Sequence, residues 1–526
     1  MTEDYVMAID AGTGSCRAVI FDRLGNQVSI AQKEWSHPTI TQYPGSQVFD
    51  TKTNWNLIRS CIRDAIEKAK ISPNQIKAVS STSMREGIVL YDSNGNEIWA
   101  CPNVDSRADE EARYLIRKGL AKKIYFKAGD WVSITTPPRL LWIKKHEPQI
   151  FEKIAHLTML SDWILYRLSG RYITDPSVGS SSNMFDLEKR TWSREIIEYC
   201  GLPYEVLPEV CEPGTVIGEV THKASLETGL KEGTLVVVGG ADTQLGLVGI
   251  GRIIPNCFTI IGGSFWQHTI ILDKPLIDPK IRLRTLCHAV PGQWMMEGIG
   301  FYCGIAMRWF RDAFCQYEKE QAEKIGVDPY ILMEKQAANV PPGSNGVIAI
   351  LSNLMNAKKW VHASPSFLQF DITNPSVSGK KECIRAIEES ATYVSYGHMK
   401  IIENLTHQKF DDVVFTGGAS KGFLWPQILA DVLNVRVHIP MIKESTALGA
   451  AIFALIGLGF YKDLASAIKD LVKFERVYEP NPDTHQKYMI LYDKWLEIYD
   501  TCLKMVKKGL LRPLWKAAGV SCTSFP

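Results

Sequence analysis

The stretch YVMAIDAGTGSCRAVIFD, residues 5–22, decides the fold. An apolar run ends at Asp10, glycines follow at positions 12 and 14, and a second apolar run ends at Asp22. Another turn at residues 24–26 predicts a third strand, so the chain is expected to begin with strands joined by tight turns. This start argues against a Rossmann dinucleotide-binding unit, which needs a helix after its first glycine turn.

Further apolar runs lead into glycines at 235–240, 257–263 and 413–418. Each run is typical of a buried strand followed by a turn, and residues 424–433 continue after the last one with helical character. Because the pattern restarts near residue 250, we expect the main boundary at about residues 250–256. No low-complexity linker separates the two halves, which predicts that they face each other across a cleft.

Composition excludes several classes of protein. The chain has 526 residues, of which 45% are hydrophobic, so global disorder is excluded. Its 59 Lys+Arg and 57 Asp+Glu give a formal charge of +2, which provides no electrostatic reason to expect a nucleic-acid or membrane-surface partner. The 12 cysteines include no Cys-x-x-Cys pair, so we expect a reduced, cytoplasmic protein without a zinc site or disulfide framework. The longest uncharged apolar stretch, residues 445–461, is short for a membrane span and is predicted to be a buried helix.

Glycine turns after strands suit phosphate binding, because backbone N–H groups can approach an anion there. Each turn alone is more often ordinary turn chemistry, and the sequence has no Walker-type Gly-x-x-x-x-Gly-Lys-Ser/Thr loop. Asp242 follows a predicted strand and two glycines, where a carboxylate serves either as a general base or as a helix cap. Asp10 ends the first strand, where an Asp also commonly starts a turn. The residues alone leave these alternatives open.

The order of these motifs resembles that of the sugar-kinase, heat-shock and actin ATPases, and within that group the chain resembles the FGGY carbohydrate kinases. The resemblance covers about residues 5–480. It is carried by residues 10–17, 138–143 (with Arg139 where Lys is usual), 175–177, 239–244 and 416–459, the last block including Lys443-Glu444-Ser445. Strings at 83–91, 98–101, 307–315 and 362–367 are similar to the bacterial branch of this family that acts on the signal autoinducer-2.

The resemblance implies an α/β fold of two ribonuclease-H-like domains, of the actin, hexokinase and heat-shock ATPase type, around a catalytic cleft. Residues 1–252 would form an N-terminal domain with the substrate site and the catalytic base, and residues 253–480 a C-terminal domain that mainly binds ATP. Residues 481–526 would form a helical basic tail, since no acidic residue follows Asp500. Basic runs of this kind are most often solvated helix faces.

The same resemblance implies roles for individual residues. Asp242 would be the catalytic general base, and Asp10 and Asp242 would hold Mg²⁺, largely through water. Arg17 would neutralise charge on the phosphates of ATP. The implied ATP-binding set is Asp10, Gly12, Thr13, Gly14, Ser15, Arg17, Gly263, Ser264, Gly304, Arg308, Gly417, Gly418 and Ala419.

The implied substrate site contains Arg85, Glu86, Asp105 and Gln244. Arg85 and Glu86 match a hydroxyl-binding pair of the family, although a buried salt bridge to another segment is an alternative. Asp105 matches a sugar-pocket position, but Asn103-Val104 replaces the usual Trp-Asn before it, so the stacking wall differs. Gln244 lies next to the base in sequence, in a position to orient the substrate.

The expected reaction transfers the ATP γ-phosphoryl group to the primary hydroxyl of autoinducer-2 in its open-chain dihydroxypentanedione form. A pentulose or glycerol kinase is the alternative within the family. A non-catalytic, actin-like ATP-binding regulator is a further alternative, against which Asp10 and Asp242 argue because a pure sensor needs no base. The expected partner is a small polyol-like substrate, with no nucleic acid and no membrane, and the sequence leaves a homo-oligomer open.

Overall fold

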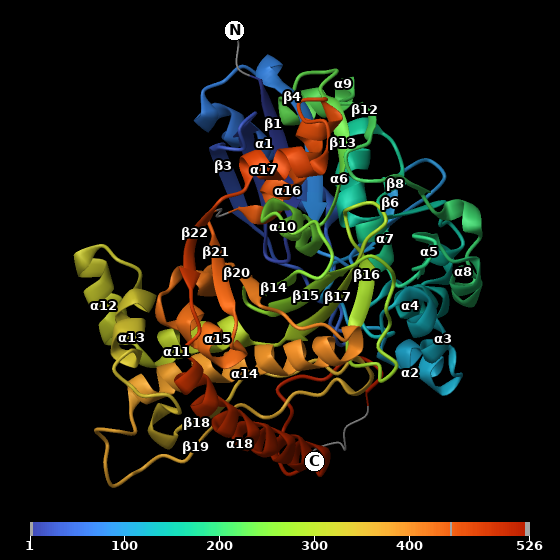
Figure 1. The fold of residues 1–526 in the computed structure, drawn as a ribbon. Helices are drawn as coiled ribbons and strands as arrows, with labels where there is room; N and C mark the ends of the chain where they lie inside the picture. The colour runs from blue at the N-terminus through green and yellow to red at the C-terminus, as the bar shows by residue number, and fades with distance from the viewer. Residues whose placement is uncertain (1–3, 442–443, 521–526) are drawn as a thin grey trace.

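Two large β-sheets, one from each half of the chain, organise the computed structural model, which describes residues 4–441 and 444–520. Lys443, quoted above in one of the family-like blocks, lies outside the described residues. Figure 1 shows the N-terminal sheet, with its first strands in blue and β12 and β13 in green, at the top and the C-terminal sheet below it, with the orange helices α16 (Ser445–Gly457) and α17 (Leu464–Leu471) beside the N-terminal strands.

The N-terminal sheet has the strand order β12-β13-β4-β1-β2-β3. Its strands are β1 (Tyr5–Ala11), β2 (Ser15–Asp22), β3 (Gln27–Glu34), β4 (Ile76–Ser83), β12 (Val216–Glu219) and β13 (Leu235–Ala241). The first three are antiparallel, as residues 5–26 predict, whereas β4 is parallel to β1 and β13 is parallel to β4. Alternate residues of β1 face two different cores: Met7 and Ile9 pack with α1 (Thr51–Ala69), and Val6 and Ala8 pack with α16.

The C-terminal sheet repeats this arrangement. Its order is β16-β17-β15-β14-β20-β21-β22, so three antiparallel strands, extended here by a fourth at the edge, again lie beside two parallel ones, with an antiparallel strand after them. The strands are β14 (Phe258–Gly262), β15 (Trp266–Leu272), β16 (Arg284–Cys287), β17 (Trp294–Gly300), β20 (Asp412–Thr416), β21 (Arg436–Pro440) and β22 (Phe474–Tyr478). The two-domain, ribonuclease-H-like α/β fold expected from the sequence is therefore confirmed.

Helices α10 (Asp242–Gly249) and α16 cross between the two sheets. The crossing is close because both helices present glycine: a Cβ on Gly249 would lie 1.9 Å from the carbonyl oxygen of Ser445, and one on Gly449 would lie 2.0 Å from that of Leu245. After β21, the chain thus returns to the N-terminal sheet through α16 and α17 before it adds β22 to the C-terminal sheet. The stretch predicted to be a buried helix is α16.

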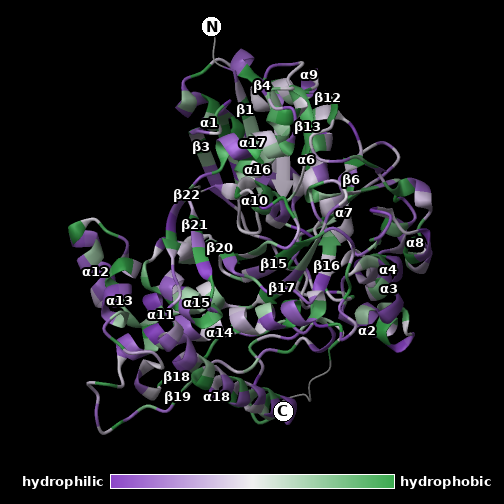
Figure 2. Cartoon of the chain, viewed as in Figure 1, coloured by the Kyte–Doolittle hydropathy of each residue, from purple (hydrophilic) through white to green (hydrophobic). Residues whose placement is uncertain are grey.

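Helices and short strands inserted between β4 and β13 connect the two sheets. The inserted elements include β5 (Ile88–Tyr91), β6 (Glu97–Cys101), α2 (Asp109–Arg117), α3 (Leu120–Ala128), α4 (Thr136–His146), β7 (His156–Met159), α6 (Leu160–Ser169) and α7 (Pro176–Ser181). The largest apolar core contains residues of both this insertion and the C-terminal sheet, such as Tyr125 and Phe258. Figure 2 shows apolar residues, in green, along the central elements of both halves and polar residues, in purple, concentrated on the outer helices and loops.

The end of the described chain packs on the C-terminal half. Helix α18 (Pro482–Lys507) lies on α15 (Leu424–Leu433) and α14 (Lys380–Thr406), and its Trp495 Nε1 donates to the carbonyl oxygen of Ala349. Tyr488 and Trp495 belong to the buried face of this helix, and Arg512 and Lys516 of the basic tail, which was expected to be helical, follow the end of the helix. Between residues 4 and 520, apart from the gap at 442–443, no helix has both the length and the apolar character needed to cross a membrane.

Candidate active site

Asp10, Arg17 and Glu444 form a chain of charges at the opening turn. Asp10 and Arg17 face each other across the β1–β2 hairpin, with Arg17 Nε 3.5 Å from Asp10 Oδ2. Arg17 Nη1 donates to Glu444 Oε2 at 2.5 Å, just before α16 begins. Burial raises the pKa of Asp10 to about 6; the Arg17 charge opposes this rise, and the charges of Asp242 and Glu444 add to it. Asp10 and Asp242 therefore interact electrostatically, although they are 232 positions apart in sequence.

Side chains of Trp35, His37 and Asn103 hold the glycine turn between β1 and β2 in place by polar contacts. Trp35 Nε1 donates to the carbonyl oxygen of Gly12 at 3.0 Å, His37 Nε2 lies 2.9 Å from that of Thr13, and Asn103 Nδ2 donates to Thr13 Oγ1 at 3.1 Å. Thr13 and Gly14 remain exposed, and a Cβ on Gly14 would meet no atom within 4 Å. The turn thus presents free backbone to solvent, which is the condition for contact with an anion.

Asp242 is the first residue of α10 and directly follows β13. Ser177 Oγ, from the predicted Asp-x-Ser block, accepts a hydrogen bond from Ala241 N at 3.0 Å and so fixes the strand end before Asp242. The Asp242 carboxylate accepts from Thr243 N at 2.6 Å, lies 3.8 Å from Arg85 Nε and is 35% exposed. Burial raises its pKa, and Arg85 counteracts that rise. The carboxylate is thus reachable by a ligand, although protein surrounds most of it.

Arg85 and Glu86, the predicted substrate pair, belong to a buried charge cluster that joins the two halves. Arg85 donates to both carboxylate oxygens of Glu297, at 2.7 and 3.1 Å. Arg284 donates to Glu297 at 2.8 Å, to Glu86 at 2.8 Å and to Asp130 at 3.3 Å. Burial opposes ionisation of Glu297, but Arg284 and Arg85 outweigh it and lower the pKa of Glu297 to about 2. The buried salt bridge considered as an alternative is present, and it lies beside Asp242.

Asp105 and Gln244, the other predicted substrate residues, are fully enclosed. Asp105 accepts from Gln47 N at 2.8 Å and from Arg107 Nε at 2.7 Å. Arg139 lies nearby and donates to the carbonyl oxygens of Glu86, Pro102, Asn103 and Asp105. Gln244 Nε2 donates to the carbonyl oxygen of Cys287 at 3.2 Å. Asp105 Oδ2 makes no hydrogen bond among the described residues but lies 3.6 Å from Arg139 Nε, whereas Gln244 Oε1 is buried without a hydrogen-bond partner among them.

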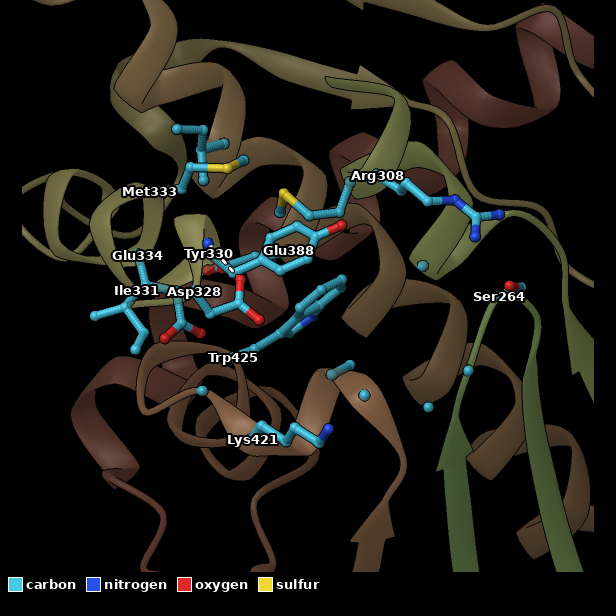
Figure 3. Close-up of a pocket in the computed structure, with 18 residues that line it drawn as sticks. Ser264, Arg308, Asp328, Tyr330, Ile331, Met333, Glu334, Glu388, Lys421 and Trp425 are labelled. Carbon is cyan, nitrogen blue, oxygen red and sulfur yellow. Dashed lines mark hydrogen bonds between the residues drawn. The ribbon is translucent and has the colours of Figure 1, made fainter. Parts of the chain in front are cut away.

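A cavity of about 510 Å³ lies in the C-terminal half, between the end of β14, the helices α11 (Cys303–Phe314), α13 (Pro329–Ala337), α14 and α15, and the turn after β20 (Figure 3). The predicted ATP-binding residues that line it are Gly263, Ser264, Gly304, Arg308, Gly418 and Ala419. Gly417 has a φ of 94°, and a Cβ there would lie 2.7 Å from the carbonyl oxygen of Gly262, so this turn approaches β14 closely. The predicted residues 10–17 and Asp242 do not line this cavity.

The sequence analysis missed several residues of both sites. Glu297, Arg284 and Asp130 were not predicted. Asp130 lies 25 positions after Asp105, Arg284 lies 20 positions after Ser264, and Glu297 lies 7 positions before Gly304, so they join Arg85 and Glu86 only through the fold. Trp425, Tyr330 and Glu388 line the cavity from three different helices. Trp425 lies within the family-like block 416–459 but was not singled out there, and the other residues stand in no glycine turn and in none of the quoted motifs.

The carboxylates of Asp10 and Asp242 fit the demands of Mg²⁺, which prefers oxygen ligands and keeps several waters, so that one or two carboxylates and a phosphate suffice. In the described part of the chain, no group of three or more His, Cys, Asp and Glu side chains is arranged to hold a metal ion by itself. The repulsion that raises the pKa of Asp10 is of the kind that a bound cation would relieve.

Comparisons with known proteins give a consistent result. The N-terminal domain of the FGGY family of carbohydrate kinases matches residues 5–249, and the C-terminal domain of that family matches residues 263–458. The chain is 44% identical over 519 residues to proteins named autoinducer-2 kinase from Salmonella typhimurium and Photorhabdus laumondii, and 98% of each chain is covered. These relatives span the full arrangement of elements described above.

Solved structures share the fold at low sequence identity. A xylulose kinase from Lactobacillus acidophilus superimposes with a TM-score of 0.83 at 23% identity, covering 95% of this chain and 98% of that one. Plasmodium falciparum glycerol kinase with ADP superimposes with a TM-score of 0.80 at 18% identity, covering 94% and 98%. These structures therefore share the overall two-domain fold of this chain.

Proposed function

The chain belongs to the FGGY family of carbohydrate kinases, and from this premise we propose that it transfers the γ-phosphoryl group of ATP to the primary hydroxyl of autoinducer-2 in its open-chain dihydroxypentanedione form. The observation that carries the choice of substrate is the 44% identity to autoinducer-2 kinases over 98% of both chains. The protein is a phosphotransferase with an alcohol group as acceptor.

Asp242 is the general base in this proposal. Its carboxylate takes the hydroxyl proton while the substrate oxygen forms a bond to the γ-phosphorus, and the bond from that phosphorus to the bridging oxygen breaks, so that ADP leaves with the electron pair. Two features support the assignment: the carboxylate is accessible at the end of β13, and Arg85, 3.8 Å away, favours its ionised form. Closure of the two halves would keep water from competing for the phosphoryl group.

ATP is proposed to lie between the two halves. Its base and ribose would occupy the cavity of the C-terminal half, near Gly418 and Ala419, and its phosphates would approach Ser264 and the turn at residues 12–15. Arg17 Nε, which has no hydrogen-bond partner within the described chain, would donate to a phosphate oxygen. Asp10 and Asp242 would hold Mg²⁺, which, when bound, neutralises phosphate charge.

The substrate is proposed to bind over the charge cluster, mainly on the N-terminal half. Arg85 and Glu86 offer a donor and an acceptor for hydroxyl and carbonyl groups, and Gln244 Oε1 is an acceptor without a donor among the described residues. Asp105, paired with Arg107 and Arg139, would complete the polar wall of the site. Glu86 has a φ of 61°, a left-handed conformation that is uncommon for a residue other than glycine. We place the enzyme in the cytoplasm, because it would meet both ATP and autoinducer-2 there.

A coupled ADP-release assay with autoinducer-2, glycerol, xylulose and ribulose tests this function. We expect kcat/KM for autoinducer-2 to exceed that for the others at least about tenfold, which requires only about 1.4 kcal/mol of differential transition-state binding. Asp242→Asn should lower kcat on the order of 10²–10⁴-fold with ATP binding retained. The matched control is Asp64→Asn, since Asp64 on α1 is 37% exposed and pairs only with Lys33 among the described residues.

The panel also separates the alternatives. Faster turnover of xylulose or glycerol would indicate a pentulose or glycerol kinase of the same family. ATP binding without ADP release for any polyol would indicate a non-catalytic regulator. Full activity of Asp242→Asn would overturn the role of the base.

A further inference from the structure

Glu388, on α14, presents an unpartnered carboxyl oxygen in the wall of the C-terminal cavity. The residue is 1% exposed, and its Oε2 has no hydrogen-bond partner within residues 4–441 and 444–520. The two other carboxyl groups of this wall are engaged: Asp328 accepts from Tyr330 N at 3.0 Å, and Glu334 accepts from Phe423 N at 3.0 Å at the start of α15. Glu388 is thus the acidic group of the wall with a buried carboxyl oxygen that has no hydrogen-bond partner among the described residues.

Such an arrangement costs stability, because a buried polar group without a partner loses its hydration and gains nothing in return. A partner is near but occupied elsewhere: Arg385, one turn earlier on α14, donates to Glu389 and to Tyr488. Burial raises the pKa of Glu388 well above its usual range; the Glu334 charge adds to this rise, and Arg385 opposes it. Burial thus favours the protonated form of this carboxyl group, and that form offers one hydrogen-bond donor and one acceptor.

The surroundings of Glu388 suit a flat, mostly apolar ligand group. Tyr330, Met333 and Trp425 line the same part of the cavity, and Trp425 Nε1 also has no partner within the described residues. Ser264 and Arg308 lie towards the opposite end (Figure 3). A nucleotide with its phosphates near Ser264 would therefore place its base beside Glu388.

Adenine carries an amino N–H next to a ring nitrogen acceptor on both of its hydrogen-bonding edges. A neutral carboxyl group complements that pair, because its carbonyl oxygen accepts from the amino group while its hydroxyl donates to the ring nitrogen. We propose that Glu388 binds the 6-amino group of adenine and is the base-recognition residue of the nucleotide site. This inference rests on the proposed kinase function and adds to it the residue that reads the base.

Isothermal titration calorimetry with ATP and with purine riboside triphosphate, which lacks the 6-amino group, tests the proposal on the wild type, Glu388→Leu and Glu388→Gln. The wild type should bind ATP at least about fivefold more tightly than the purine analogue, the size of one net hydrogen bond. Glu388→Leu should reduce this ratio to about one, and Glu388→Gln should restore most of it, because an amide also offers an acceptor and a donor.

Glu389→Gln is the matched control, since Glu389 is the next residue of α14, is equally enclosed and binds Ser344 Oγ and Gly343 N instead of facing this cavity. It should lower the thermal midpoint and leave the ATP-to-analogue ratio unchanged. Glu388→Leu removes an unpaired polar group, so its thermal midpoint should equal or exceed that of the wild type. An unchanged ratio in Glu388→Leu would overturn the inference alone, whereas failure of the wild type to bind either nucleotide would overturn the proposed function as well.

Discussion

Replacing Asp10 by Asn should make the unliganded protein more stable at neutral and alkaline pH. Burial raises the pKa of this carboxyl group from 3.8 to about 6, so the folded protein binds the proton more tightly than the unfolded chain does. The folded state therefore carries a penalty that is absent below about pH 4, grows as pH rises towards 6 and is complete above 6. A pKa raised this far corresponds to about 3 kcal/mol at pH 8, which an uncharged Asn avoids.

Urea denaturation followed by tryptophan fluorescence, at pH 8 and at pH 4, measures this difference. At pH 8 the Asp10→Asn protein should be more stable by up to about 3 kcal/mol, and at pH 4 the two proteins should converge. Magnesium and ATP together should raise the unfolding midpoint of the wild type more than that of the variant, because Asp10 is proposed to hold the ion. The same residue would then lower stability and support activity.

Asp278→Asn provides a control, because its expected change in the free energy of unfolding at pH 8 has the opposite sign to that of Asp10→Asn. The Asp278 side chain is buried, but its bonds to Arg282, one of them 2.8 Å long, outweigh the effect of burial and lower the pKa of Asp278. That variant should be less stable than the wild type at pH 8, and its deficit should shrink as the pH falls through the acidic range. The reasoning fails if Asp10→Asn is destabilising at pH 8, or if its gain is the same at pH 4.

Three further substitutions test other parts of the structure. Gly249→Ala should lower the free energy of unfolding by about 1–3 kcal/mol in denaturant titrations, because its Cβ would lie 1.9 Å from the carbonyl oxygen of Ser445. The control is Gly246→Ala on the same helix, whose Cβ would have its nearest contact at 3.4 Å; this substitution should leave the stability unchanged or raise it. Arg85→Ala should raise KM for the polyol substrate and leave ATP affinity nearly unchanged in calorimetry, and a loss of ATP affinity alone would contradict the assigned site. Gly418→Val should fold normally, since a Cβ there has no neighbour closer than 4.0 Å, but should weaken ATP binding while the substrate still binds.

The strand-and-glycine pattern predicted the fold because each element carries its own local signal. The run before Asp10 alternates towards two cores, and the glycines after it permit a turn that most residues would strain. Asp10 and Asp242 stand out as acidic residues at the ends of apolar strands, but the pattern alone leaves a turn or a helix cap open, and their predicted roles come from the resemblance to the FGGY kinases. The helix over residues 445–457 was recognisable as buried from its composition, but its sequence does not say which sheet it covers.

The parts of the site that escaped prediction depend on distant partners. Glu297 owes its role to Arg85, 212 positions earlier in the chain, and to Arg284 on the neighbouring strand. The sequence around this glutamate does not indicate such a pairing, because the partners meet only when the two halves of the chain pack together. Glu388 is a similar case, because only the packing of α13, α14 and α15 shows that its neighbours leave its carboxyl group without a partner.

The return of α16 and α17 to the N-terminal sheet has a consequence for synthesis on the ribosome. Strand β13 ends at Ala241, but the helices that cover one face of its sheet end only at Leu471, roughly 230 residues later. At a translation rate of about 5–20 residues per second, that apolar face waits on the order of 10–50 s for its cover. The nascent N-terminal half should therefore depend on chaperones during this interval, and it should aggregate when it is expressed without residues 444–471.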